Sequence, residues 1–199
     1  MKKIILIICL LFLCGCSVVR IDTKNIDNII GVVLSKDNTL FNQVGKGYKY
    51  YVPRGVSYID TSTYNDVLYS NGNYYYLYID IVSYYYNTNK EYQLDDKAYY
   101  SKVINVNNKS GYLEINKQDD GKYFIEFMYN YAKIEVIADY DEINNIVLNA
   151  SYILSTVKFN NNVIKTVLDD EFLNAEEKYD IFTSKKETND FLKLEEGVE

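Results

Sequence analysis

Hydrophobic and polar residues alternate along the middle of the chain, from residue 40 to residue 138, as is typical of antiparallel β-strands. The alternating runs are separated by turn sequences, among them Pro53-Arg54-Gly55 and Asn71-Gly72. Because Asn-Gly readily adopts the positive φ angles of a type I′ turn, residues 67–70 and 73–86 are predicted to form a hairpin.

The acidic turn at residues 119–122 is predicted to close a second hairpin, between residues 112–117 and 123–130. The same stretch can be compared with a calcium-binding loop that begins at Asn116, since Asp120 and Gly121 have the required spacing. Such a loop ends in Glu, but its last position here is Phe127. The hairpin is therefore the favoured interpretation, and residues 132–138 are predicted to form the next strand.

The residues before the strands are predicted to form an N-terminal helix over 23–35, with Asp22 or Thr23 as its N-cap. Its apolar positions follow helical spacing and are Ile26, Ile29, Ile30 and Val33. The adjacent valines and Gly31 leave a strand over residues 29–34 as the alternative.

A long amphipathic helix is predicted after the last strand, with Asp139 or Asp141 as its cap. Its continuous apolar stripe consists of Ile143, Ile146, Val147, Ala150, Leu154 and Val157. Burying each large side chain contributes about 1.5–3 kcal/mol, so the stripe is expected to cover one face of the sheet. The predicted fold class is α+β: an antiparallel β-sheet packed by a long amphipathic helix, with an N-terminal helix and short C-terminal helices.

The C-terminal part of the chain is acidic. Two helical turns are predicted over residues 163–168, at the end of an α+β domain of residues 23–168. Residues 169–199 contain eleven Asp or Glu against four Lys and are predicted to form a helical tail docked on the domain. The whole chain has a formal net charge of -7. A nucleic-acid partner is not expected, because neutralising phosphates requires a basic surface.

The first residues have the pattern of a secretory signal: Lys2 and Lys3 precede a short apolar run at residues 4–13. The run ends in Leu13-Cys14-Gly15-Cys16, which resembles the lipobox of bacterial lipoproteins. The resemblance implies that residues 1–15 are removed, that Cys16 receives diacylglycerol and often a further acyl chain such as palmitate, and that residues 16–22 form a short tether. The protein would then lie on the extracytoplasmic side of the cell membrane. A transmembrane anchor is less favoured, because spanning a bilayer takes about 20 apolar residues.

The chain contains no His, and its three cysteines, Cys9, Cys14 and Cys16, all lie at the lipobox or before it. A mature chain that begins at Cys16 cannot form an internal disulfide, and it lacks the common zinc and copper ligands. No metal or cofactor site is therefore predicted. Catalysis that depends on His is excluded, whereas a carboxylate pair or a Ser-Lys pair remains compatible with the sequence.

The strand rich in tyrosine offers the sharpest candidate for a binding surface. Its core-facing positions are predicted to be Tyr75, Leu77, Ile79 and Ile81. The opposite positions are Tyr74, Tyr76, Tyr78, Asp80 and Tyr84. Tyrosine combines an apolar ring with a polar tip, so this row could bind a sugar or a peptide. The alternative is a structural row that is typical of strands or is covered by the C-terminal helices.

The order of elements over residues 48–159, together with the Pro53 turn and the long helix, resembles the PsbP/DcrB-like α+β group. That resemblance implies a non-enzymatic module of the cell envelope. We therefore expect a monomeric, lipid-anchored, non-catalytic module that binds an envelope protein or glycan. The alternatives are an assembly factor that acts through its acidic tail and a small hydrolase that uses carboxylates or a Ser-Lys pair.

Overall fold

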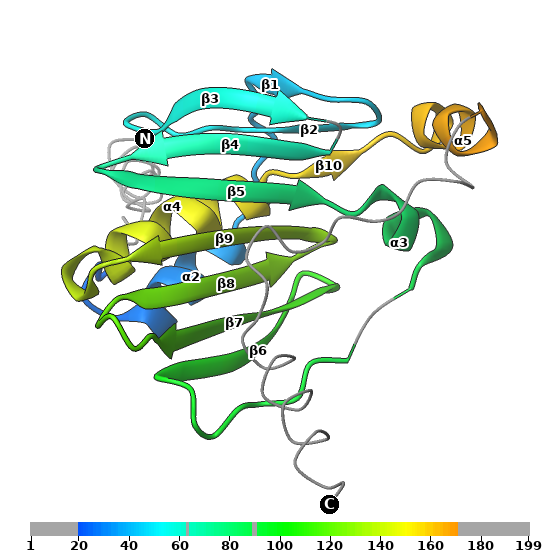
Figure 1. The fold of residues 1–199 in the computed structure, drawn as a ribbon. Helices are drawn as coiled ribbons and strands as arrows, with labels where there is room; N and C mark the ends of the chain where they lie inside the picture. The colour runs from blue at the N-terminus through cyan, green and yellow to red at the C-terminus, as the bar shows by residue number, and fades with distance from the viewer. Residues whose placement is uncertain (1–19, 63, 89–90, 171–199) are drawn as a thin grey trace, which may run out of the picture.

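The seven-stranded antiparallel sheet is the largest element of the fold in the computed structural model, which describes residues 20–62, 64–88 and 91–170 (Figure 1). Its strand order is β3-β4-β5-β9-β8-β7-β6. The bounds are β3 Ser57–Ser62, β4 Asn65–Ser70, β5 Asn73–Ile79, β6 Tyr100–Val106, β7 Lys109–Lys117, β8 Tyr123–Tyr129 and β9 Ala132–Ala138. Together with the helices described below, the sheet confirms the predicted α+β class.

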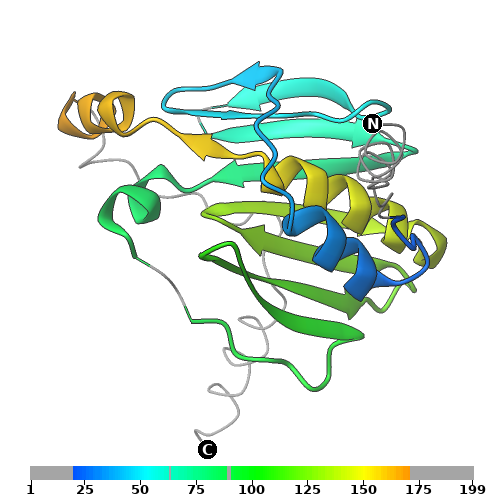
Figure 2. The same ribbon diagram turned by 180° about the vertical axis from the view of Figure 1, so that it is seen from behind.

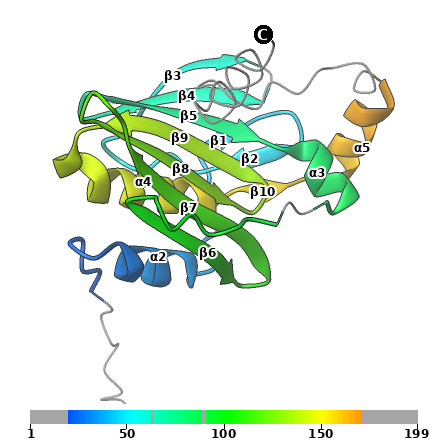
Figure 3. The same ribbon diagram turned by 60° about the horizontal axis from the view of Figure 1, so that its bottom comes forward.

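A second, three-stranded antiparallel sheet has the order β1-β2-β10. Its strands are β1 Gln43–Val44, β2 Tyr48–Tyr50 and β10 Lys158–Phe159. β10 therefore brings the chain that follows the long helix back beside a strand near the N-terminal end. Two further helices, α3 (Ile81–Tyr86) and α5 (Asn161–Asp170), contact each other at one end of the molecule (Figures 1 and 3).

Two helices, α2 (Ile26–Leu34) and α4 (Ile143–Ser155), lie side by side on one face of the large sheet (Figure 2). α4 contacts β8 and β9, and all six residues of its predicted apolar stripe are buried. Buried side chains of β8 and β9, such as Phe127 and Ile134, meet this stripe and form the hydrophobic core. We call this helix-covered surface the inner face and the opposite surface the outer face.

Local turn chemistry explains the hairpins. Asn71 and Gly72 have φ angles of 49° and 82°, as the predicted type I′ turn between β4 and β5 requires. Gly121, with φ 87°, lies in the turn between β7 and β8, so the predicted second hairpin is confirmed. The strand predicted over residues 132–138 coincides with β9.

The predicted helix caps are wrong at α2 and at α4. Helix α2 begins at Ile26, and its N-cap is Asn25, whose side chain accepts a hydrogen bond from Asn28 N at 3.0 Å. Asp22 instead accepts from Lys24 N in the preceding turn. The alternative of a strand over residues 29–34 is also wrong, because those residues belong to α2.

At α4, a 3-10 turn, η1 (Tyr140–Glu142), precedes the helix. The Asp139 side chain makes no capping hydrogen bond; its backbone carbonyl accepts one from Glu142 N at 3.1 Å. Asp141 lies within η1, and the N-cap position of α4 is occupied by Glu142, whose side chain makes no capping hydrogen bond. The predicted signal, Cys16 and the acidic tail beyond Asp170 lie outside the described residues, whereas the two turns predicted over 163–168 form part of α5.

Candidate functional site

The tyrosine-rich strand ends earlier than predicted, at Ile79 instead of Tyr86. Asp80 caps α3: its carboxylate accepts a hydrogen bond from Ser83 N at 2.8 Å, and the residue is buried. The prediction that Asp80 faces outward beside the tyrosines is therefore wrong. Strand propensity favours β-structure in this run of Ile, Val and Tyr. Asp is also a preferred N-cap residue, and here its capping hydrogen bond starts a helix instead.

Tyr84 is also separated from the other tyrosines, because it belongs to α3. Its ring stacks on Phe159 with 3.9 Å between centroids, and it meets Tyr131 edge-on. Together with Lys49 and Lys158 it lines a cavity of about 510 Å³ beside the small sheet. Tyr84 thus joins α3 to β10 and is not part of the sheet face predicted from the sequence.

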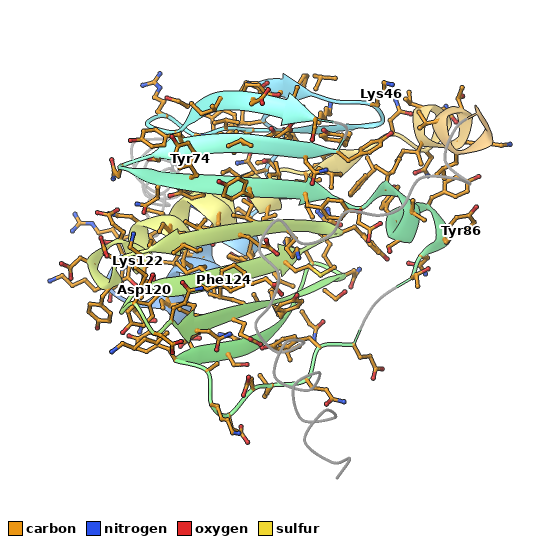
Figure 4. The ribbon with its side chains drawn as sticks, in the orientation of Figure 1. Lys46, Tyr74, Tyr86, Asp120, Lys122 and Phe124 are labelled. Atoms are coloured by element: carbon orange, nitrogen blue, oxygen red, sulfur yellow. The ribbon has the colours of Figure 1, made fainter. Side chains whose placement is uncertain are left out.

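Three of the five predicted residues, Tyr74, Tyr76 and Tyr78, do lie on the outer face of β5. Tyr75, Leu77 and Ile79 are fully buried on the inner face, so the alternating positions point the other way. Tyr74 is 49% exposed and pairs with Tyr69 of β4, which is 36% exposed, at a centroid distance of 5.1 Å. In Figure 4, Tyr74 lies over the sheet, whereas Tyr86 lies beyond the sheet at α3.

A row of glutamates continues this face from Tyr76 across the sheet. Glu135, Glu126 and Glu114 are directly opposite one another on β9, β8 and β7. Like charges in such positions repel unless they are paired. Lys133 supplies one pairing: its Nζ lies 2.6 Å from Glu135 Oε1 and 3.9 Å from Glu126 Oε2. Glu135 is only 2% exposed, so its carboxylate depends on this lysine.

Two tyrosines donate hydrogen bonds to the remaining carboxylates of the row. The Tyr112 hydroxyl donates to Glu126 and the Tyr92 hydroxyl donates to Glu114, while the two rings stack at 4.0 Å. Burial and the hydrogen bond to Glu114 raise the pKa of Tyr92 to about 12. Burial and the Glu126 carboxylate likewise raise the pKa of Tyr112. Sequence reasoning missed this polar layer, although the alternation of Glu126 with buried neighbours predicts that it faces outward.

A second site lies on the opposite side of the large sheet, between β3 and β4 and the small sheet. Asp66 occupies a core-facing position of β4 and is only 4% exposed, yet it lines a cavity of about 500 Å³. We call this cavity the Asp66 pocket. Its other lining side chains include Lys46, Tyr48, Tyr50, Tyr58, Thr61 and Tyr64.

Hydroxyl groups surround the Asp66 carboxylate. Tyr50 Oη donates to Oδ2 at 2.6 Å, while Thr61 Oγ1 and Tyr58 Oη donate to Oδ1 at 2.6 and 3.3 Å. Burial, and after it the hydrogen bond to Asp66, raises the pKa of Tyr50. The sequence gives no sign of this pocket, because the register of β2, β3 and β4 brings its residues together.

No protein-family model, curated protein or solved structure matches this chain.

What the two sites can do therefore follows from their geometry. Within residues 20–62, 64–88 and 91–170, no group of His, Cys, Asp and Glu side chains is placed to hold a metal ion. In the same ranges, no helix is long and apolar enough to span a membrane. The outer face offers exposed aromatic rings beside paired charges, and the Asp66 pocket offers a buried carboxylate among tyrosines. Both arrangements suit the binding of a partner or ligand.

Proposed function

We propose that this protein is a lipid-anchored, non-catalytic module of the bacterial cell envelope that binds an envelope protein or glycan through the outer face of its large sheet. The observation that carries this proposal is the exposed Tyr69–Tyr74 pair, on a face that no helix of the described ranges covers (Figures 1 and 2).

The outer face has the character of a recognition surface. Aromatic rings with polar tips supply a large contact area with little loss of conformational entropy, and tyrosine is enriched at binding interfaces. The adjacent carboxylates are paired with Lys133 and with the hydroxyls of the stacked Tyr92 and Tyr112, so directed contacts fix their positions beside the rings. A partner would therefore meet a preorganised surface, which lowers the entropic cost of binding.

The proposed anchor is the lipid on Cys16, which follows from the lipobox Leu13-Cys14-Gly15-Cys16. Ile21 packs against the hydrophobic core, so the folded domain begins five residues after this cysteine. Five extended residues span at most about 18 Å. An anchored domain would thus sit close to the membrane surface, and its partner would have to be reachable there. The resemblance to the PsbP/DcrB-like group also favours a non-enzymatic module.

The binding face can be tested with a matched pair of exposed tyrosines. The full chain carrying a photo-crosslinking residue at position 69 is expressed in its native membrane, and the crosslinked partners are recovered. Tyr74→Ala should abolish the crosslinked products. Tyr86→Ala should preserve them, because Tyr86 is 63% exposed but lies on α3. Identical products from both variants would contradict the proposal.

The anchor has its own pair of variants. Cys16→Ser should block metabolic labelling with a fatty acid and release the protein from the membrane fraction. Cys14→Ser changes a neighbouring cysteine of the same stretch and should leave both properties intact. Membrane retention of the Cys16→Ser protein without lipid labelling would instead favour an uncleaved transmembrane segment.

A further inference from the structure

The Asp66 pocket contains a buried negative charge that faces a cavity. Charged residues are rarely buried without a partner of opposite charge, so a nearly buried carboxylate at a core-facing position requires an explanation. In the described part of the chain, the neutral hydroxyls of Tyr50, Tyr58 and Thr61 donate hydrogen bonds to it, and the Tyr48 hydroxyl also lies against it. The protein therefore solvates the carboxylate with hydroxyl groups, and within residues 20–62, 64–88 and 91–170 no Lys or Arg forms a salt bridge with it.

The hydrogen bonds determine which chemical groups the pocket can accept. Each hydroxyl has one proton. The Tyr50 and Tyr58 hydroxyls donate theirs to the Asp66 carboxylate. Thr61 Oγ1 lies 2.6 Å from the carboxylate and 3.1 Å from Ser62 O, so the carboxylate is its nearer acceptor. The oxygen atoms of these hydroxyls still have lone pairs, so they can accept hydrogen bonds from a ligand. Around Asp66 the cavity thus presents acceptors and a negative charge, which a ligand with several N–H donors and a positive charge would complement.

The tyrosine rings of the pocket favour the same kind of ligand. The centroid of the Tyr48 ring lies 6.3 Å from that of Tyr50 and 6.0 Å from that of Tyr64. Aromatic rings attract cations through the negative charge of their faces. Tyr64 is buried and has a φ angle of 62°, a strained conformation for a bulky residue that must be stabilised by its surroundings.

Lys46, the other charged residue of the lining, does not reverse this preference. Its side chain is exposed, so water and salt screen its charge, whereas the charge of Asp66 is shielded from solvent. The ammonium of Lys46 could additionally meet an acidic group of a ligand whose amine is bound at Asp66. The sign of the field inside the pocket is set by the buried carboxylate.

We propose that the Asp66 pocket binds a small molecule that carries a primary ammonium group, with Asp66 as its counter-ion and the surrounding hydroxyl oxygens as acceptors. A volume of about 500 Å³ suits a small organic ligand. This site is separate from the outer face, so it does not depend on the function proposed for that face.

Isothermal titration calorimetry on the full chain in detergent micelles tests the proposal with a series of matched probes. Phenethylamine should bind saturably, and phenethyl alcohol, which lacks the charge, should bind at least about tenfold more weakly. Phenyltrimethylammonium, a cation without N–H donors, should also bind about tenfold more weakly. L-Phenylalanine should bind at least as well as its ester if Lys46 contacts the acid group. Equal affinity for the amine and the alcohol, or no saturable binding at millimolar concentrations, would overturn the proposal.

Variants then assign the binding to this pocket. Asp66→Asn should weaken phenethylamine binding at least about tenfold. Because that substitution alters a buried group, Val44 offers a second test: it lines the pocket and is 74% exposed, so charges placed there should not disturb folding. Val44→Lys should weaken binding about twofold and Val44→Glu should strengthen it to a similar extent. If none of the three substitutions changed the affinity for phenethylamine, the amine would bind elsewhere and the proposal would be overturned. As a control, Tyr74→Ala on the outer face should leave the affinity unchanged.

Discussion

The two faces of β8 show that different interactions stabilise the two sides of the large sheet. Ile125, Phe127 and Tyr129 on the inner face are fully buried under α4, whereas Phe124 and Glu126 on the outer face are half-buried. The inner face is stabilised by the burial of apolar surface, which is non-directional and proportional to area. The outer face is stabilised by directed pairings, such as that between Lys133 and Glu135.

This difference separates stability from recognition in the molecule. Where α2 and α4 cover the inner face, no partner can reach it. Its side chains are closely packed, so it tolerates only small changes in volume. A polar face can stay open to a partner, yet each of its buried charges depends on a particular neighbour. Substitutions on the two faces should therefore destabilise the protein for different reasons.

The largest effect is expected in the core. Phe127→Ala should lower the free energy of unfolding by about 4 kcal/mol, because it removes a fully buried ring and leaves a cavity beneath α4. Phe124→Ala, three residues earlier on the outer face (Figure 4), should cost less than half as much, since this residue is half-buried. Urea denaturation of the two variants measures both values. Equal losses would show that the outer face is packed as tightly as the inner one.

A smaller loss is expected from the outer face when Lys133 is changed. Lys133→Met should cost about 3 kcal/mol, because it leaves the carboxylate of Glu135 buried without its cation. The double variant Lys133→Met with Glu135→Gln should recover most of this loss, since the uncompensated charge is then gone. Denaturation curves of the single and double variants give the unfolding free energies for this double-mutant cycle. If the double variant were no more stable than Lys133→Met, the pairing would not be what stabilises this row.

Elements with strong local chemistry were predictable from the sequence. The Asn71-Gly72 turn needs only two residues with positive φ, and the bounds of β9 follow from alternation alone. At the end of β5, where the prediction failed, a tertiary contact acts together with the local cap at Asp80. Asp80 N donates a hydrogen bond to Tyr131 O at 2.8 Å. This contact between distant segments fixes the backbone at the residue between the end of β5 and the start of α3.

The candidate sites were less predictable than the fold, because they combine residues from several strands. The outer positions of Tyr74, Tyr76 and Tyr78 follow from period-two alternation, and they were predicted correctly. The Asp66 pocket depends on the register that pairs β3 with β4 and on the small sheet beneath them. A single sequence does not specify that register, since an Asp in a strand is equally compatible with an exposed position.

The third prediction concerns Tyr129, whose buried hydroxyl donates to Val106 O at 2.9 Å on the inner side. Burial raises the pKa of Tyr129 to about 12. Because this pKa lies above that of tyrosine in the unfolded chain, the stabilisation is complete below pH 10 and is lost as the pH rises towards 12. The loss should be about 2 kcal/mol. Unfolding measured from pH 8 to 12 should show a shallower decline for Tyr129→Phe, and an unchanged decline for Tyr74→Phe.

The smallest effect should come from the rim of the inner face, where Asp27 of α2 pairs with β6. Its carboxylate accepts hydrogen bonds from Lys102 and from Tyr100 Oη, and these contacts lower the pKa of Asp27, that from Lys102 most strongly. A lowered pKa in the folded state contributes stability above about pH 4 that is lost as the pH falls through the folded value. Since both charges are substantially exposed, the contribution should be about 0.5 kcal/mol or less and should shrink in high salt.

Stability measured between pH 7 and pH 2.5 should therefore fall less steeply in Asp27→Asn than in the parent protein. Lys102→Met should reproduce most of that change, because Lys102 is the main cause of the lowered pKa. Tyr100→Phe should reproduce less of it. If instead Tyr100→Phe had the larger effect, the hydroxyl rather than the ammonium would control Asp27. The attachment of α2 to the sheet edge would then be insensitive to salt, and the rim would resemble the hydroxyl-solvated Asp66 more than the ion-paired Glu135.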